Sequence, residues 1–137
     1  MLRKVLWSFC LAFLPLFFFA QGTVKEPVKD LVVQALKTGN SKLLAQHFIA
    51  NIDLTTPGGS EIYSKAQAEQ ILRKFFDEQQ PVDMVLEHSG ESKQGDKYHI
   101  GILRTQKGYF RVTFFLKKSG DVLQVKQLRI ETGNSDF

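Results

Sequence analysis

Residues 64–86 read SKAQAEQILRKFFDEQQPVDMVL, and the spacing of apolar residues changes within this stretch. Up to Glu78, apolar side chains recur at helical spacing, which predicts an amphipathic helix over Lys65–Glu78. Ser64 and Gln67 have the spacing of a capping box and should mark its start. After Pro81, apolar and polar residues alternate, as in a strand that buries one face. The stretch therefore predicts a long helix that leads directly into a sheet.

Three more segments with strand-like alternation follow, which predicts a four-stranded meander. In the last segment, Leu123 and Val125 are in phase, and the pattern resumes out of step at Leu128. That slip implies one extra residue, so we expect a β-bulge near Lys126-Gln127. The other positions expected to face the core are Val82, Met84, Leu86, Tyr98, Ile100, Ile102, Phe110, Val112, Phe114 and Leu116.

The segment before the long helix contains two shorter helices and a hairpin. Pro27 suits the first turn of a helix over 27–38, which Gly39-Asn40 ends. Asn40 or Ser41 can cap a second helix over 41–47. Strands at Ile52–Thr56 and Glu61–Tyr63 flank a Pro-Gly-Gly turn. Helices on one face of an antiparallel sheet make an α+β domain.

The first twenty residues have the features of a secretory signal. Arg3 and Lys4 precede the uncharged apolar run Val5–Phe19, and cleavage fits after Ala20 or after Gly22. An uncleaved anchor is the alternative, although the run is short for a spanning helix. We expect residues 1–20 to be removed and residues 21–137 to form one domain, ordered over about 24–131. The protein would then be periplasmic or secreted, without a stable membrane span.

Composition argues against several classes of function. The only cysteine, Cys10, lies in the apolar run, so the mature chain would contain no disulfide, thiolate nucleophile or cysteine-bound metal. Without Arg3 and Lys4, 16 of the 18 basic residues remain against 14 acidic ones, and they are evenly spread. This balance does not indicate a nucleic-acid-binding surface. The three histidines show no ligand spacing, so we expect no metal and no cofactor.

Two parts of the sequence carry a family resemblance. Residues 53–60 (DLTTPGGS) with 63–68 (YSKAQA), and residues 98–101 (YHIG) with 108–112 (GYFRV), are similar to a family of small exported bacterial proteins catalogued as a domain of unknown function. The order of elements resembles the nuclear transport factor 2-like superfamily. The resemblance implies a cone-shaped domain that can hold a small apolar ligand in its mouth and dimerise through its outer sheet face.

The superfamily includes a steroid isomerase and a dehydratase, but no catalytic residue can be matched to this chain. Three residues remain as candidates. His88 shares the phase of the core residues and could act as an acid–base group; alternatively, it is a strand-end histidine bonded to the backbone. Asp53 could be a base at the cone mouth, with Tyr63 nearby; alternatively, it fixes the adjacent turn. The expected cavity residues are Tyr63, Phe75, Met84, His88 and Tyr98.

The opposite face of the late strands is half apolar. Its expected residues are Val85, Leu103, Tyr109, Arg111 and Phe115. They are either scattered surface hydrophobes or an interface for a dimer or partner.

We therefore expect an exported, non-catalytic domain that binds a small apolar ligand or a protein partner and could form a homodimer. One alternative is an isomerase- or dehydratase-type enzyme that uses His88 or Asp53 with Tyr63 or Tyr98. Another is an accessory subunit that binds an envelope protein.

Overall fold

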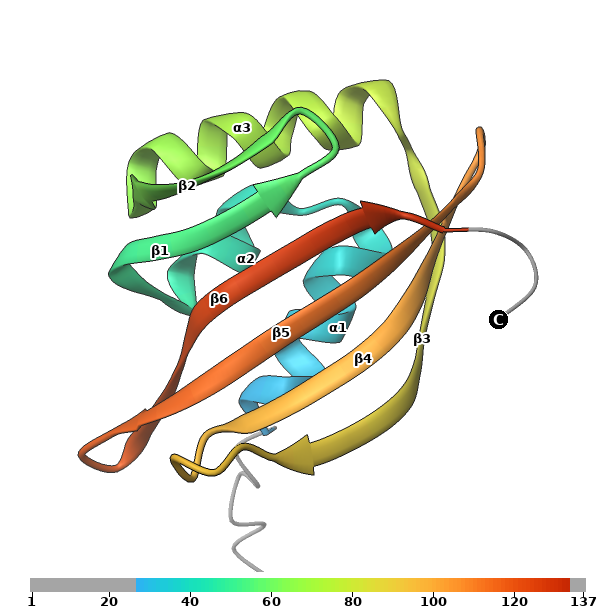
Figure 1. Ribbon diagram of the computed structural model, residues 1–137. Helices are drawn as coiled ribbons and strands as arrows, with labels where there is room; N and C mark the ends of the chain where they lie inside the picture. Colours follow the sequence, from blue (N-terminus) through green and yellow to red (C-terminus); the bar gives the residue numbers. More distant parts are fainter. Residues whose placement is uncertain (1–26, 134–137) are drawn as a thin grey trace, which may run out of the picture.

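The structure is a computed structural model that describes residues 27–133 (Figure 1). The expected signal peptide, with its cleavage sites after Ala20 or Gly22, lies outside the described residues. Within residues 27–133, no helix is both long enough and apolar enough to cross a membrane.

Three helices form where the sequence predicts them. Helix α1 spans Val28–Thr38, α2 spans Ser41–Gln46 and α3 spans Lys65–Glu78. Gly39 ends α1 with a left-handed φ of 66°, a conformation that glycine adopts without steric cost. Of the two candidate caps for α2, Asn40 makes the bond, because its side chain accepts from the Leu43 N–H at 3.0 Å.

Six strands form one sheet in the order β2-β1-β6-β5-β4-β3. All neighbours pair antiparallel except β1 and β6, which pair parallel and so join the hairpin to the meander. Helix α1 contacts β3, whereas α3 contacts both strands of the hairpin (Figure 1). The α+β fold with helices on one face of a curved sheet is confirmed, apart from that parallel pair. The strands are β1 (Phe48–Thr56), β2 (Gly59–Ser64), β3 (Pro81–Glu91), β4 (Lys97–Thr105), β5 (Tyr109–Ser119) and β6 (Val122–Thr132).

The core lies between the helices and the inner face of the sheet. Leu72, Phe75 and Phe76 of α3 are buried there, as the helical spacing predicts. The largest side chains that are fully buried are Phe48, Phe114, Leu36, Leu44, Ile52, Leu54, Leu72, Leu103, Leu116, Leu128, Ile130 and Val32.

The predicted bulge in β6 is confirmed. Phe115 pairs with Gln127 and Leu116 with Val125, which leaves Lys126 as the extra residue. The Lys126 ammonium forms an ion pair with the carboxylate of Asp96, the residue before β4.

The predicted phase of β4 is wrong. Four residues of β4 face the core, namely His99, Gly101, Leu103 and Thr105. Tyr98, Ile100 and Ile102 lie on the outer face and are half-buried. The outer face of β4 carries Tyr98, Ile100 and Ile102, whereas Leu103 is the only large apolar side chain on its inner face, so alternation indicated the wrong face. Leu103, expected on the outer face, is 0% exposed and belongs to the core.

A second bulge, in β3, reverses the expected orientation of His88. Leu86 pairs with Gly101, but His88 pairs with Ile100, so one residue of β3 is left over between them. His88 therefore shares the outer face with Ile100 and is exposed. The expectation that it points inward is wrong, because bulges shift every following side chain to the other face.

Candidate functional site

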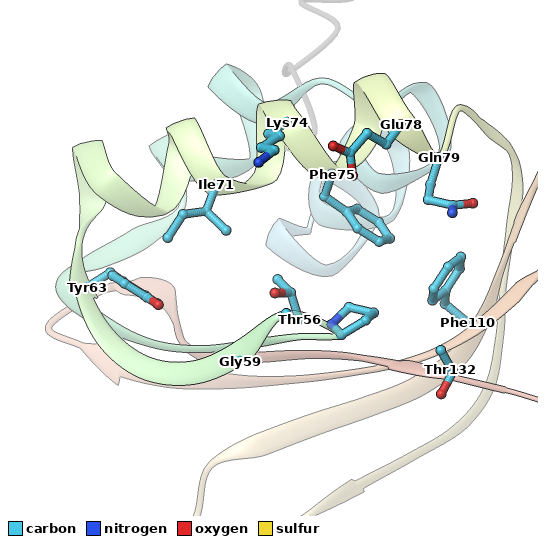
Figure 2. A pocket seen from close by; sticks show the side chains of 12 residues that line it. Thr56, Gly59, Tyr63, Ile71, Lys74, Phe75, Glu78, Gln79, Phe110 and Thr132 are labelled. Carbon is cyan, nitrogen blue, oxygen red and sulfur yellow. The ribbon is translucent and has the colours of Figure 1, made fainter.

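A cleft of about 480 Å³ opens between α3 and the β1–β2 hairpin. Figure 2 shows Ile71 and Phe75 pointing into it from α3, with Tyr63 and Phe110 on the side of the sheet. Its lining residues are Thr56, Pro57, Gly58, Gly59, Tyr63, Ile71, Lys74, Phe75, Glu78, Gln79, Phe110 and Thr132.

The helix α3 places its residues in the cleft with little freedom. Its first turn is fixed by the capping box, in which Ser64 Oγ accepts from the Gln67 N–H at 3.2 Å and the Gln67 side chain accepts from the Ser64 N–H at 3.2 Å. At the other end, the Gln79 N–H donates to the Phe75 carbonyl at 2.8 Å. Residues three and four apart share one side of a helix, so this side carries Ile71, Lys74, Phe75 and Glu78.

The inner part of the cleft is aromatic. Phe75 and Phe110 meet edge to face, with ring centroids 5.1 Å apart and planes at 83°. Tyr63 lies on the same side of the sheet as Ile52, with which it pairs across the hairpin. Phe75 and Phe110 form a rigid apolar floor, since edge-to-face pairs are favourable arrangements of aromatic side chains.

The rim of the cleft is polar. Lys74 and Glu78 are exposed, and the ion pairs formed within residues 27–133 involve other side chains. Gln79 is held in place because its Oε1 accepts a hydrogen bond from Thr105 Oγ1 at 3.1 Å. The cleft therefore combines an apolar floor with a charged edge.

Only two of the five expected cavity residues line this cleft. Tyr63 and Phe75 do so, whereas Met84 is 5% exposed in the core. His88 and Tyr98 lie on the outer face for the reasons given above. The helical spacing of α3 also predicts that Ile71 lies on the same face as Phe75. Phe110 and the polar residues of the rim were not predicted to line a cavity, because no sequence motif links them to Tyr63 or Phe75.

The candidate catalytic residues do not converge. Asp53 pairs with Gln127 on the outer face and accepts a hydrogen bond from its Nε2 at 3.1 Å. His88 is on the same face, whereas Tyr63 is in the cleft on the inner side. Asp53 therefore does not fix the neighbouring turn either.

The outer face is partly apolar across the neighbouring strands β3, β4 and β5. Val85 is 53% exposed and pairs with Ile102, which pairs with Arg111. Tyr98 and Phe115 stack beside them with centroids 5.7 Å apart. Tyr109 is 42% exposed on the same face. Four of the five residues expected there are present, the exception being Leu103.

His99 is a buried polar residue on the inner face of β4. Its Nδ1 lies 2.6 Å from Ser89 Oγ, and its ring packs on Phe114 at 5.1 Å. Burial lowers the pKa of His99 below its ordinary value of 6.5; Lys29 and Lys97 lower it further, and Asp30 partly opposes them. The imidazole is therefore a neutral packing element near pH 7.

No group of three or more histidine, cysteine or acidic side chains that could hold a metal ion occurs within the described part of the chain.

The fold defined by this sheet, these helices and this cleft is that of nuclear transport factor 2-like proteins. Such a protein of unknown function from Cytophaga hutchinsonii is similar in structure, with a TM-score of 0.55 and 14% identity over 81% of this chain and 94% of that chain. At that identity, the likeness shows the fold alone.

The chain belongs to the family described as Domain of unknown function (DUF4783), whose model matches residues 29–131. A family protein from Bacteroides uniformis has a TM-score of 0.72 and 30% identity over 79% of this chain and 99% of that chain. Another, from Bacteroides ovatus, has a TM-score of 0.71 and 30% identity over 77% of this chain and 94% of that chain. No curated protein matches the chain.

Proposed function

We propose that this chain is a non-catalytic binding domain that holds a small, mainly apolar molecule in the cleft between α3 and the β1–β2 hairpin. The observation that carries the proposal is the aromatic floor inside a cleft of about 480 Å³. Sites for small molecules commonly have volumes of about 300–1,000 Å³ and mostly apolar linings with a few polar groups.

The positions of the candidate acid–base residues favour binding over catalysis. A general acid or base must reach the same substrate as the group that assists it. Asp53 and His88 are separated from Tyr63 by the sheet itself. An isomerase or dehydratase that paired either residue with Tyr63 would have no common substrate position.

The test fills the cleft and measures the loss of binding. N-phenyl-1-naphthylamine, a neutral apolar fluorophore, should bind the wild-type domain at one site with increased emission. Ile71→Trp should weaken binding about tenfold or more, a change of about 1.4 kcal/mol, because the larger ring occupies the space of the probe.

Val122→Trp is the matched control, because Val122 is 54% exposed and does not line the cleft. It should bind the probe like the wild type. Equal affinity in the wild type and Ile71→Trp, or no saturable binding at all, would rule out the cleft as the binding site.

The outer sheet face supports a second proposal, that two copies of the domain associate through it. The exposed Val85, Tyr109 and the stacked Tyr98–Phe115 pair lie on adjacent strands and make a surface with both apolar and charged groups, since Arg111 lies among them. Interfaces are enriched in aromatic residues and arginine.

Sedimentation velocity over a range of concentrations tests the dimer. The wild type should show a dimer that Val85→Lys dissociates, because the substitution puts a charge into the apolar part of the interface. Val122→Lys, at the turn between β5 and β6, should leave the dimer intact. A wild type that stays monomeric throughout would contradict this second proposal.

We also propose that the domain functions outside the cytoplasm, on the support of the signal-like N-terminal sequence. Protein recovered from the periplasm or medium should begin at Gln21 or Thr23. Recovery only from the cytoplasm, with Met1 or Leu2 at its N-terminus, would exclude export.

A further inference from the structure

We propose that the occupant of the cleft is a single-chain amphiphile with a zwitterionic head group. This inference rests on the proposed binding function and specifies the chemistry of the ligand. Lys74 and Glu78, both at the cleft, place a positive and a negative charge one helical turn apart at the edge of an aromatic floor.

These two charges are available for a ligand. Lys74 and Glu78 are four residues apart on α3, yet the ion pairs within residues 27–133 do not include them. Lysine four residues before glutamate is the less favourable order for a pair on a helix. Figure 2 shows both side chains along α3 on the same side of the cleft, next to Phe75.

A head group with one kind of charge fits this edge less well. A simple anion would be attracted by Lys74 but repelled by Glu78. A simple cation would be attracted by Glu78 but repelled by Lys74. A head that carries both charges can place its anionic group near the ammonium of Lys74 and its cationic group near the carboxylate of Glu78. Charge complementarity of this kind gives selectivity more than affinity.

The floor favours an aliphatic chain over a peptide as the body of the ligand. Ile71, Phe75 and Phe110 offer no hydrogen bonds, and peptide groups buried against them would lose those they make with water. A hydrocarbon chain has no such cost and gains from burial.

The experiment compares amphiphiles that share a dodecyl tail, all used below their micelle concentrations. Dodecylphosphocholine, dodecanoate and dodecyltrimethylammonium displace N-phenyl-1-naphthylamine from the full domain in low salt. Dodecylphosphocholine should bind tighter than either of the others by about two- to fivefold, since each favourable contact is exposed to water. This preference should vanish in about 1 M salt, where the screening length is only about 3 Å.

Two substitutions separate the head group from the tail. Lys74→Gln should favour the cationic amphiphile over the anionic one by about threefold, and Glu78→Gln should do the opposite. Lys65→Gln and Asp77→Asn make the same changes of net charge on α3 but away from the cleft. Neither should therefore change the order in which the three amphiphiles rank by affinity.

The inference is overturned if the three head groups bind equally, if one singly charged head binds tightest, or if the leucyl-phenylalanine dipeptide displaces the probe better than dodecylphosphocholine. In each of these cases, loss of binding in Ile71→Trp would still support the cleft as a binding site. If the probe itself does not bind, the proposed function fails as well.

Discussion

Gly101 is the residue at which β4 comes closest to β3. A Cβ atom built there would overlap the Val85 carbonyl oxygen and lie 2.9 Å from Met84 Cε. The backbone of the edge strand β3 therefore packs against this position, just before the bulge that turns His88 outward. Only glycine allows the two strands to approach so closely.

The first prediction is that Gly101→Ala lowers the free energy of unfolding by about 3 kcal/mol, because overpacking against a backbone cannot be relieved by rotating a side chain. Urea denaturation followed by circular dichroism measures it. Gly108→Ala is the control, since a Cβ there meets nothing within 4 Å, and it should change the stability little. Equal stability of the two variants would show that β3 and β4 are not so close.

His99 predicts how stability depends on pH. Its pKa is lower in the folded protein than the ordinary 6.5, so below about pH 6.5 the unfolded chain binds more protons. Stability should therefore be fully present above that pH and decrease as the pH falls. Burial also lowers the pKa of His47, which adds to the effect in the same direction.

Urea unfolding at about pH 7.5 and about pH 5 tests this second prediction. His99→Asn should reduce the difference between the two values. A difference that is as large in His99→Asn as in the wild type would assign the pH dependence to other groups.

Among the elements, α3 is the one that positions the cleft, and it was also the best predicted. Its bounds and its capping box follow from residues within fifteen positions of one another, so local physics determines them. The phases of β3 and β4 could not be predicted in the same way. His88 turns outward at a bulge that has no turn residue to mark it, and the outer face of β4, with Tyr98, Ile100 and Ile102, is more apolar than its inner face.

The third prediction concerns the start of α3. Ser64→Ala removes the side chain that accepts from the Gln67 N–H and should cost about 1 kcal/mol of unfolding free energy. Ser119→Ala, at the exposed end of β5, is the control and should cost less than about 0.5 kcal/mol. A loss in Ser64→Ala no larger than in Ser119→Ala would mean that the cap does not hold the helix.

The fourth prediction concerns the bulge of β6. Lys126 and Asp96 form a partly buried ion pair, with side chains 28% and 13% exposed. Lys126→Met and Asp96→Asn should each cost about 1–2 kcal/mol, and the double variant should cost less than their sum, because the second change removes a charge already left without its partner. Thermal unfolding of the wild type, the two single variants and the double variant completes this double-mutant cycle. Strictly additive losses would contradict an interaction between the two side chains.

On the scale of the whole molecule, the cleft depends on contacts between distant segments. The parallel pairing of β1 with β6 brings the hairpin to the meander, and only then do the hairpin residues and Phe110 line the same cleft. Amphipathic spacing predicted Phe75, and the hairpin predicted Tyr63. Lys74, Glu78 and Gln79 read as an ordinary solvated helix face, so their position at a cleft edge could not be predicted from the sequence.

One titration tests directly whether a ligand binds in the cleft. Amide chemical shifts of the labelled domain are followed by nuclear magnetic resonance as dodecylphosphocholine is added below its micelle concentration. Binding in the cleft predicts saturable shifts that cluster at Gly59, Tyr63, Ile71, Phe75 and Phe110, with little change at Tyr98 and Phe115. Shifts confined to Tyr98, Phe115 and their neighbours on the outer face, or no saturable shifts, would contradict it.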